Sequence, residues 1–118
     1  MYYTARDFNG TLSIGAATSA SVLGPYKDIG GPLARDSRAA RRVPGHAEYV
    51  EYPGMYLDSH YFYDDASATH HLLWKHGSVT PPAETETWLY LQQLDDTGTR
   101  LVGERRVVLR NNLSLIHI

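Results

Sequence analysis

The sequence contains no cysteine and no long apolar run, and it is close to neutral. Without cysteine among its 118 residues, disulfide bonds and thiolate metal sites are excluded. No apolar stretch approaches the roughly 20 residues that a membrane-spanning helix needs. A net charge of −2 gives no overall attraction to nucleic acid or to an anionic membrane. We therefore expect neither nucleic acid nor a membrane as a partner.

Helical patterns are also scarce. The one candidate helix, Ala34–Arg42, carries four arginines but has no apolar stripe to bury. A basic face for an acidic ligand is one interpretation of this segment, and a solvated insertion loop is the interpretation we prefer. At Met1 there is no basic leader before an apolar segment, and the chain begins within a strand-like pattern. We therefore expect the natural N-terminus to lie further upstream.

Short strand-like runs, separated by turn signals, make up most of the chain. Tyr2–Arg6 and Thr11–Thr18 flank an Asn-Gly pair, which predicts a type I′ hairpin turn. Four later runs are joined by short polar connections; they are residues 58–63, 70–75, 87–94 and 101–109. They predict an all-β protein with an antiparallel four-strand meander, which is one blade of a β-propeller or one sheet of a sandwich. A single blade leaves both faces of its sheet uncovered and needs neighbours.

The histidines do not form a predicted metal site. His70 and His71 are adjacent on a predicted strand, so their side chains point to opposite faces and cannot chelate one ion. We accordingly name no metal ligand and expect no cofactor. There is no Gly-x-Ser-x-Gly motif to support a serine nucleophile.

Carboxylates are the remaining candidates for chemistry. Four of them lie in turns, where aspartate bonds its own downstream backbone, and we assign them structural roles; they are Asp64, Asp65, Asp95 and Asp96. Asp58 differs because it stands at the head of a strand that is otherwise aromatic. His60, two residues further on, shares its face on a regular strand and is a candidate to line a cleft. A half-buried polar residue without a functional role is the interpretation that we prefer for His60.

Several segments, in order along the chain, resemble glycoside hydrolase family 43. They are Tyr3–Asp7, Ile14–Ser19, Leu23–Asp28, Leu57–Asp58, Tyr61–Asp65, Leu72–Lys75, Trp88–Tyr90 and Leu101–Glu104. The match runs from Tyr2 to Asn112 and is interrupted by the arginine-rich insertion. No single segment is diagnostic, and the resemblance depends on the ordered set.

The resemblance implies a five-bladed β-propeller that hydrolyses glycosidic bonds in plant-type polysaccharides, with arabinosyl and xylosyl linkages as the usual targets. Members of the family invert the anomeric centre. One carboxylate activates the attacking water and another protonates the leaving oxygen, and these two carboxylates lie about 6.5–9.5 Å apart. A third carboxylate raises the pKa of the acid and orients it. In the family this residue begins an inner strand in an Ile-Asp-Pro-type motif, which maps onto Asp58. Ser59 stands here in place of the usual proline.

We therefore expect residues 1–112 to be part of such a propeller, about one and a half to two blades. The resemblance places the general base before Met1 and the general acid after Asn112, so the chain alone is expected to be inactive. Glu84, Glu86 and Glu104 are not assigned to these roles. A non-catalytic carbohydrate-binding propeller module is the alternative, and family resemblance makes secretion plausible.

The last six residues, LSLIHI, do not continue the strand pattern. They resemble the translation of an adapter used in sequencing libraries. We predict that residues 113–118 are a non-native tail, and we give His117 no role.

Overall fold

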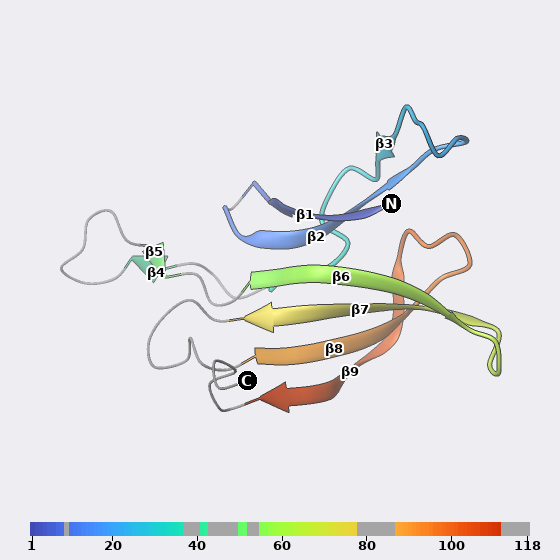
Figure 1. Cartoon of the computed structure of the whole chain (residues 1–118). Helices are drawn as coiled ribbons and strands as arrows, with labels where there is room; N and C mark the ends of the chain where they lie inside the picture. The colour runs from blue at the N-terminus through green and yellow to red at the C-terminus, as the bar shows by residue number, and fades with distance from the viewer. Residues whose placement is uncertain (9, 37–40, 43–49, 52–54, 78–86, 112–118) are drawn as a thin grey trace.

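The computed structural model describes residues 1–8, 10–36, 41–42, 50–51, 55–77 and 87–111, and this part of the chain is all β (Figure 1). Its strands are β1 Tyr2–Arg6, β2 Leu12–Thr18, β3 Lys27–Asp28, β4 Arg41–Arg42, β5 Val50–Glu51, β6 Met55–Asp64, β7 Thr69–Gly77, β8 Thr87–Leu94 and β9 Leu101–Asn111. They form three antiparallel sheets, ordered β1-β2-β3, β4-β5 and β6-β7-β8-β9. Within these ranges no helix is long and apolar enough to cross a membrane.

The predicted four-strand meander is confirmed, because β6 to β9 are neighbours in the sheet in their order along the chain. The pairing of β7 with β8 is regular from His70 opposite Leu94 to Gly77 opposite Thr87. The outer pairs are irregular, since β6 carries one bulge against β7, and β9 shifts register twice against β8. The observed strands extend the predicted runs by a few residues at the ends of β6, β7 and β9.

The N-terminal hairpin is also confirmed, with β1 paired to β2 from Tyr2 opposite Ala16 to Arg6 opposite Leu12. Its turn differs from the prediction. The backbone amide of Gly10 donates to the carbonyl of Asp7 at 2.8 Å, so Gly10 is the last residue of this turn and not one of its two central residues. Gly10 has a φ of 78°, a left-handed conformation that glycine adopts without steric cost. The predicted conformation of Asn9 lies outside the described residues.

The candidate helix Ala34–Arg42 is not helical where the structure describes it. Ala34 forms a β-bridge with Ile14, and Arg41–Arg42 pair with Val50–Glu51 as the two-stranded sheet β4-β5. Residues 37–40 lie outside the described part. A segment without an apolar stripe has nothing to bury against the sheet as a helix, which is the physical reason for the correction.

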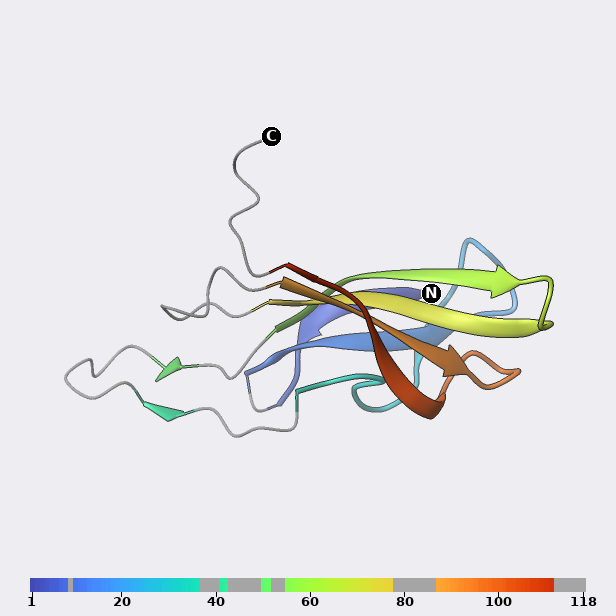
Figure 2. The same ribbon diagram turned by 90° about the horizontal axis from the view of Figure 1, so that it is seen from below.

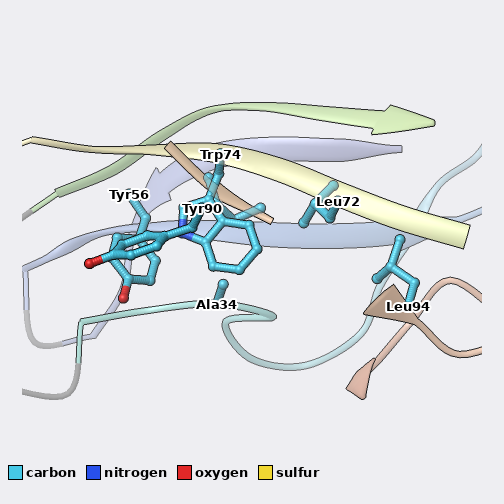
Figure 3. Packing of buried hydrophobic residues seen from close by; sticks show 7 residues of the cluster. Ala34, Tyr56, Leu72, Trp74, Tyr90 and Leu94 are labelled. Atoms are coloured by element: carbon cyan, nitrogen blue, oxygen red, sulfur yellow. The ribbon is translucent and has the colours of Figure 1, made fainter. Parts of the chain in front are cut away.

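The core lies between the N-terminal hairpin and one face of the four-stranded sheet (Figures 1 and 3). Ile14 from β2 is fully buried together with Leu72 and Trp74 from β7. Tyr56 and Tyr90 complete an aromatic cluster with Trp74, and the ring centroids of these three residues lie 5.7–6.0 Å apart. In both ribbon views the N-terminal hairpin lies beside β6, the edge strand of this sheet (Figures 1 and 2).

The opposite face of the four-stranded sheet carries a row of leucines interrupted by Lys75. Leu57, Lys75 and Leu89 lie opposite one another across β6, β7 and β8, so they share this face, and Leu109 of β9 continues the row. These side chains are only half-buried, and Leu109 is 57% exposed. Apolar side chains on both faces of a sheet are the pattern expected of a blade that packs between neighbours.

Candidate functional site

Asp58 lies in a β-bulge near the start of β6. Leu57 pairs with Lys75 and His60 pairs with Leu73, so Asp58 and Ser59 together stand opposite the single residue Trp74. The extra residue gives Asp58 a φ of 53°, in the left-handed region. Bulges bend a strand locally and redirect a side chain, and they recur beside active sites. The local backbone therefore presents Asp58 differently from every other side chain of β6.

The carboxylate of Asp58 forms an ion pair with Lys75. Lys75 Nζ lies 2.8 Å from Asp58 Oδ2, and the exposed fractions of the two side chains are 36% for the lysine and 70% for the aspartate. As its exposure shows, Asp58 faces solvent in this chain, and it lies on β6, the edge strand of the four-stranded sheet. In a propeller blade, the first strand of four is the one nearest the central channel.

His60 is exposed and lies just after the bulge. The prediction that it shares a face with Asp58 assumed simple alternation, which the bulge interrupts. The register instead places His60 opposite Leu73, on the same face as Lys75, and Lys75 is the partner of Asp58. His60 therefore remains close to the candidate carboxylate along the strand, and its predicted role in binding substrate stays a prediction.

The three histidines of β7, His70, His71 and His76, have separate environments. His70 Nδ1 lies 2.8 Å from the hydroxyl of Tyr61, and the ring of His71 stacks on Phe62 at a centroid distance of 5.3 Å. His76 Nε2 lies 3.3 Å from a carboxylate oxygen of Asp36. In the ranges that the structure describes, no group of three histidine, aspartate or glutamate side chains is arranged to hold a metal ion.

Two of the turn aspartates have the predicted structural role. Asp64 accepts hydrogen bonds from the hydroxyl of Ser67 at 2.5 Å and from the backbone amide of Ala66 at 3.1 Å. These bonds lower the pKa of Asp64 below its ordinary value of 3.8, and the bond from Ser67 has the largest effect. Asp95 in the β8–β9 turn has a similar set of bonds. Among the acids left unassigned, Glu104 is exposed on β9, while Glu84, Glu86 and the tail residue His117 lie outside the described part.

A polar and aromatic cluster beside the start of β6 was not predicted. The hydroxyl of Tyr56 accepts a hydrogen bond from Arg105 Nη1, and the Arg105 guanidinium lies over the ring of Tyr90, 4.2 Å from its centroid. His76 contacts the Tyr56 ring edge-on, with centroids 5.4 Å apart. Alternation along the strands could have placed Tyr56, His76 and Tyr90 on one face. Nothing in the sequence pointed to Asp36, which is 40 residues from His76.

Comparison of the sequence with protein-family models gives no match, and none is found among curated proteins. The fold does match a solved structure, the crystal structure of a thermostable family-43 glycoside hydrolase, with a TM-score of 0.68 and 24% sequence identity. The match covers 94% of this chain and 31% of the other, so this chain spans about a third of that enzyme's length.

The fold of this chain is thus similar to that of part of a glycoside hydrolase. More particularly, the fold resemblance to glycoside hydrolase family 43 is confirmed over nearly the whole chain, as is the all-β, antiparallel architecture. At this level of identity the similarity concerns the fold.

Proposed function

We propose that residues 1–112 are part of the propeller domain of an inverting glycoside hydrolase that acts on xylan- or arabinan-type polysaccharides or oligosaccharides. The observation that carries the proposal is the fold match to a family-43 glycoside hydrolase over 94% of the chain. The ordered segments that resemble this family support it independently. The position of Asp58, in a bulge near the start of the first strand of a four-stranded blade, fits the third carboxylate of the family.

Asp58 would act through its charge and not by transferring a proton. A carboxylate near the general acid raises the pKa of that acid by like-charge repulsion, so the acid stays protonated at the pH of the reaction. The acid then protonates the leaving oxygen while the base deprotonates the attacking water. Both of these groups lie outside residues 1–112 in this proposal, so the 118-residue chain should have no useful rate by itself.

The test compares the 118-residue chain with the longer polypeptide encoded by the same reading frame, using aryl β-xylosides and aryl α-L-arabinofuranosides. We expect hydrolysis by the longer polypeptide only. Asp58→Asn should lower its kcat by about 100-fold, the scale of a lost acid–base contribution. The descending, alkaline side of its pH profile should also move to lower pH.

Two results would contradict the proposal. Turnover by the 118-residue chain that Asp58→Asn abolishes would show that this chain is catalytically complete. Absence of hydrolysis by the longer polypeptide on every aryl glycoside would argue against an enzyme.

A non-catalytic carbohydrate-binding module is the second candidate, and one feature of β6 favours it. Tyr61, Phe62 and Tyr63 are consecutive and expose 38–44% of their surfaces. Aromatic rings of this kind stack on the apolar faces of sugars. Titration calorimetry of the longer polypeptide with xylo- and arabino-oligosaccharides would support this candidate if binding occurred without release of reducing ends.

A further inference from the structure

We infer that Lys75 is the positioning residue for Asp58, and that its ammonium group fixes the direction of the Asp58 carboxylate. The inference rests on the proposed function and extends it to a second residue. Lys75 Nζ lies 2.8 Å from Asp58 Oδ2, within the range of a charge-assisted hydrogen bond.

The pairing follows from the register of two strands. Lys75 on β7 lies opposite Leu57, and the bulge begins with the next residue, Asp58. Lys75 is the only lysine or arginine in β6 and β7. Asp58 therefore has one strong cation within its own hairpin, and backbone pairing holds that cation one position away.

The bulge fixes the backbone at Asp58 but leaves its side chain free to rotate. A φ of 53° directs the Cα–Cβ bond away from the regular positions of the strand. Two side-chain torsions then remain, and each has alternative rotamers in an exposed aspartate. The contact with Lys75 selects among them, because Oδ2 lies 2.8 Å from Nζ in one arrangement.

Lys75 is suited to this role because its own side chain is constrained. It lies between Leu57 and Leu89 across the strands, and only 36% of it is exposed. A lysine stem packs along apolar neighbours of this kind while its charged end reaches a partner. An exposed ion pair adds little to stability, so orientation of the carboxylate is the effect to measure.

Orientation of Asp58 matters in the proposed mechanism because the interaction of two charges falls with their separation. If the carboxylate turns away, the general acid loses part of the repulsion that keeps it protonated. Replacing Lys75 should therefore lower kcat, as replacing Asp58 does, and the two losses should not add.

The experiment measures kcat, KM and pH profiles of the longer polypeptide for Lys75→Met, Lys75→Arg, Asp58→Asn and the double variant Asp58→Asn with Lys75→Met. We expect Lys75→Met to lower kcat by roughly 10-fold or more, since misplacement of a group near the reacting atoms has effects of this size. KM should change less than twofold. Lys75→Arg should restore most of the rate. In the Asp58→Asn background, Lys75→Met should add less than a twofold loss.

If Lys75→Met lowered kcat equally in the wild-type and Asp58→Asn backgrounds, the inference would be overturned. A structural defect lowers kcat whether or not Asp58 is present. An unchanged kcat in Lys75→Met with active wild type would also overturn it, while leaving the proposed function intact. Wild type without hydrolysis would instead contradict the proposed function.

The contact itself is tested by NMR on the 118-residue chain, without any assay of activity. We expect the two β-protons of Asp58 to have unequal couplings to Hα in the wild type, as in one fixed rotamer, and averaged couplings in Lys75→Met. Averaged couplings in the wild type would overturn the inference whatever the activity.

Discussion

At Asp58 the chain adopts a φ of 53°, a conformation in which the Cβ atom of most residues is crowded by the backbone. Aspartate and asparagine tolerate this region better than alanine does, because a short polar side chain bonds locally. The residue type at this position is thus set partly by the backbone and not only by the charge that the proposed chemistry needs.

In a regular strand, an alanine variant is more stable than a glycine variant at the same position. The left-handed conformation at Asp58 reverses this order of stability. We expect Asp58→Ala to be less stable than Asp58→Gly by roughly 1 kcal/mol, because alanine meets the left-handed penalty and glycine does not. Urea unfolding of the two variants of the 118-residue chain measures the difference.

His60 in the same strand provides the matched control, since it is exposed and regularly paired with Leu73. There we expect the ordinary order, with His60→Gly less stable than His60→Ala by about 0.5–1 kcal/mol. The same order at both positions would contradict the bulge geometry.

At the scale of single elements, the turn between β8 and β9 is organised by one carboxylate. Asp95 accepts hydrogen bonds from the Thr97 hydroxyl at 2.9 Å and from the backbone amides of Thr99 and Arg100 at 3.0 and 3.2 Å. Partial burial acts to raise the pKa of Asp95, but these bonds outweigh it, and the pKa lies below its ordinary value of 3.8. A depressed folded-state pKa means that the stabilisation is present above the unfolded-state value and is lost as the pH falls below it.

We therefore expect Asp95→Asn to lower the unfolding midpoint near pH 7, with a smaller difference from wild type near pH 2.5, because Asp95 loses its charge progressively as the pH falls. Thermal unfolding at the two pH values measures it. Thr97→Val, which removes one donor, should show a weaker form of the same pH dependence, and Thr97→Ser should resemble wild type. A constant difference between Asp95→Asn and wild type from pH 7 to 2.5 would contradict this account.

The sequence was sufficient to predict those elements whose signals are local. The run Thr87–Leu94 was predicted with both of its ends, because alternation and the flanking turn residues define them. The bulge at Asp58 was not predictable, since it depends on how β6 aligns with β7 and not on either strand alone. The contact between Asp36 and His76 depends on tertiary structure, and the turn register at Gly10 depends on how β1 pairs with β2.

The residues of the candidate site also divide into those that the sequence could predict and those that depend on strand pairing. Asp58 was selected by its place at the head of an aromatic strand and by family resemblance. Its partner Lys75 was not selected, because a single lysine on a strand carries no signal until the strand pairing is known. The sequence favoured a solvated loop where β4 lies and a candidate short strand over His46–Tyr52, where β5 lies, but it did not predict that these two segments pair.

At the scale of the whole molecule, the N-terminal hairpin and the four-stranded sheet share one core. Ile14 contributes from β2 and is fully buried, whereas Trp74 and Leu94 contribute from the sheet. Strands β1 and β2 both lie against β6 (Figure 1). Because this core joins segments far apart in the sequence, we expect both parts to unfold in one transition.

Ile14→Ala tests this expectation from the side of the hairpin. Removing buried methyl groups should lower the free energy of unfolding by about 2–5 kcal/mol. Both tryptophans lie in the four-stranded sheet, so their fluorescence reports on the element that does not contain the mutation. The fluorescence midpoint in urea should fall together with the far-UV circular dichroism midpoint. Ile14→Val, the matched control, should lower stability by only about 0.5–1.5 kcal/mol. A fluorescence transition that stays at the wild-type midpoint while the dichroism transition moves would show that the sheet folds without the hairpin and that the two do not form one cooperative unit.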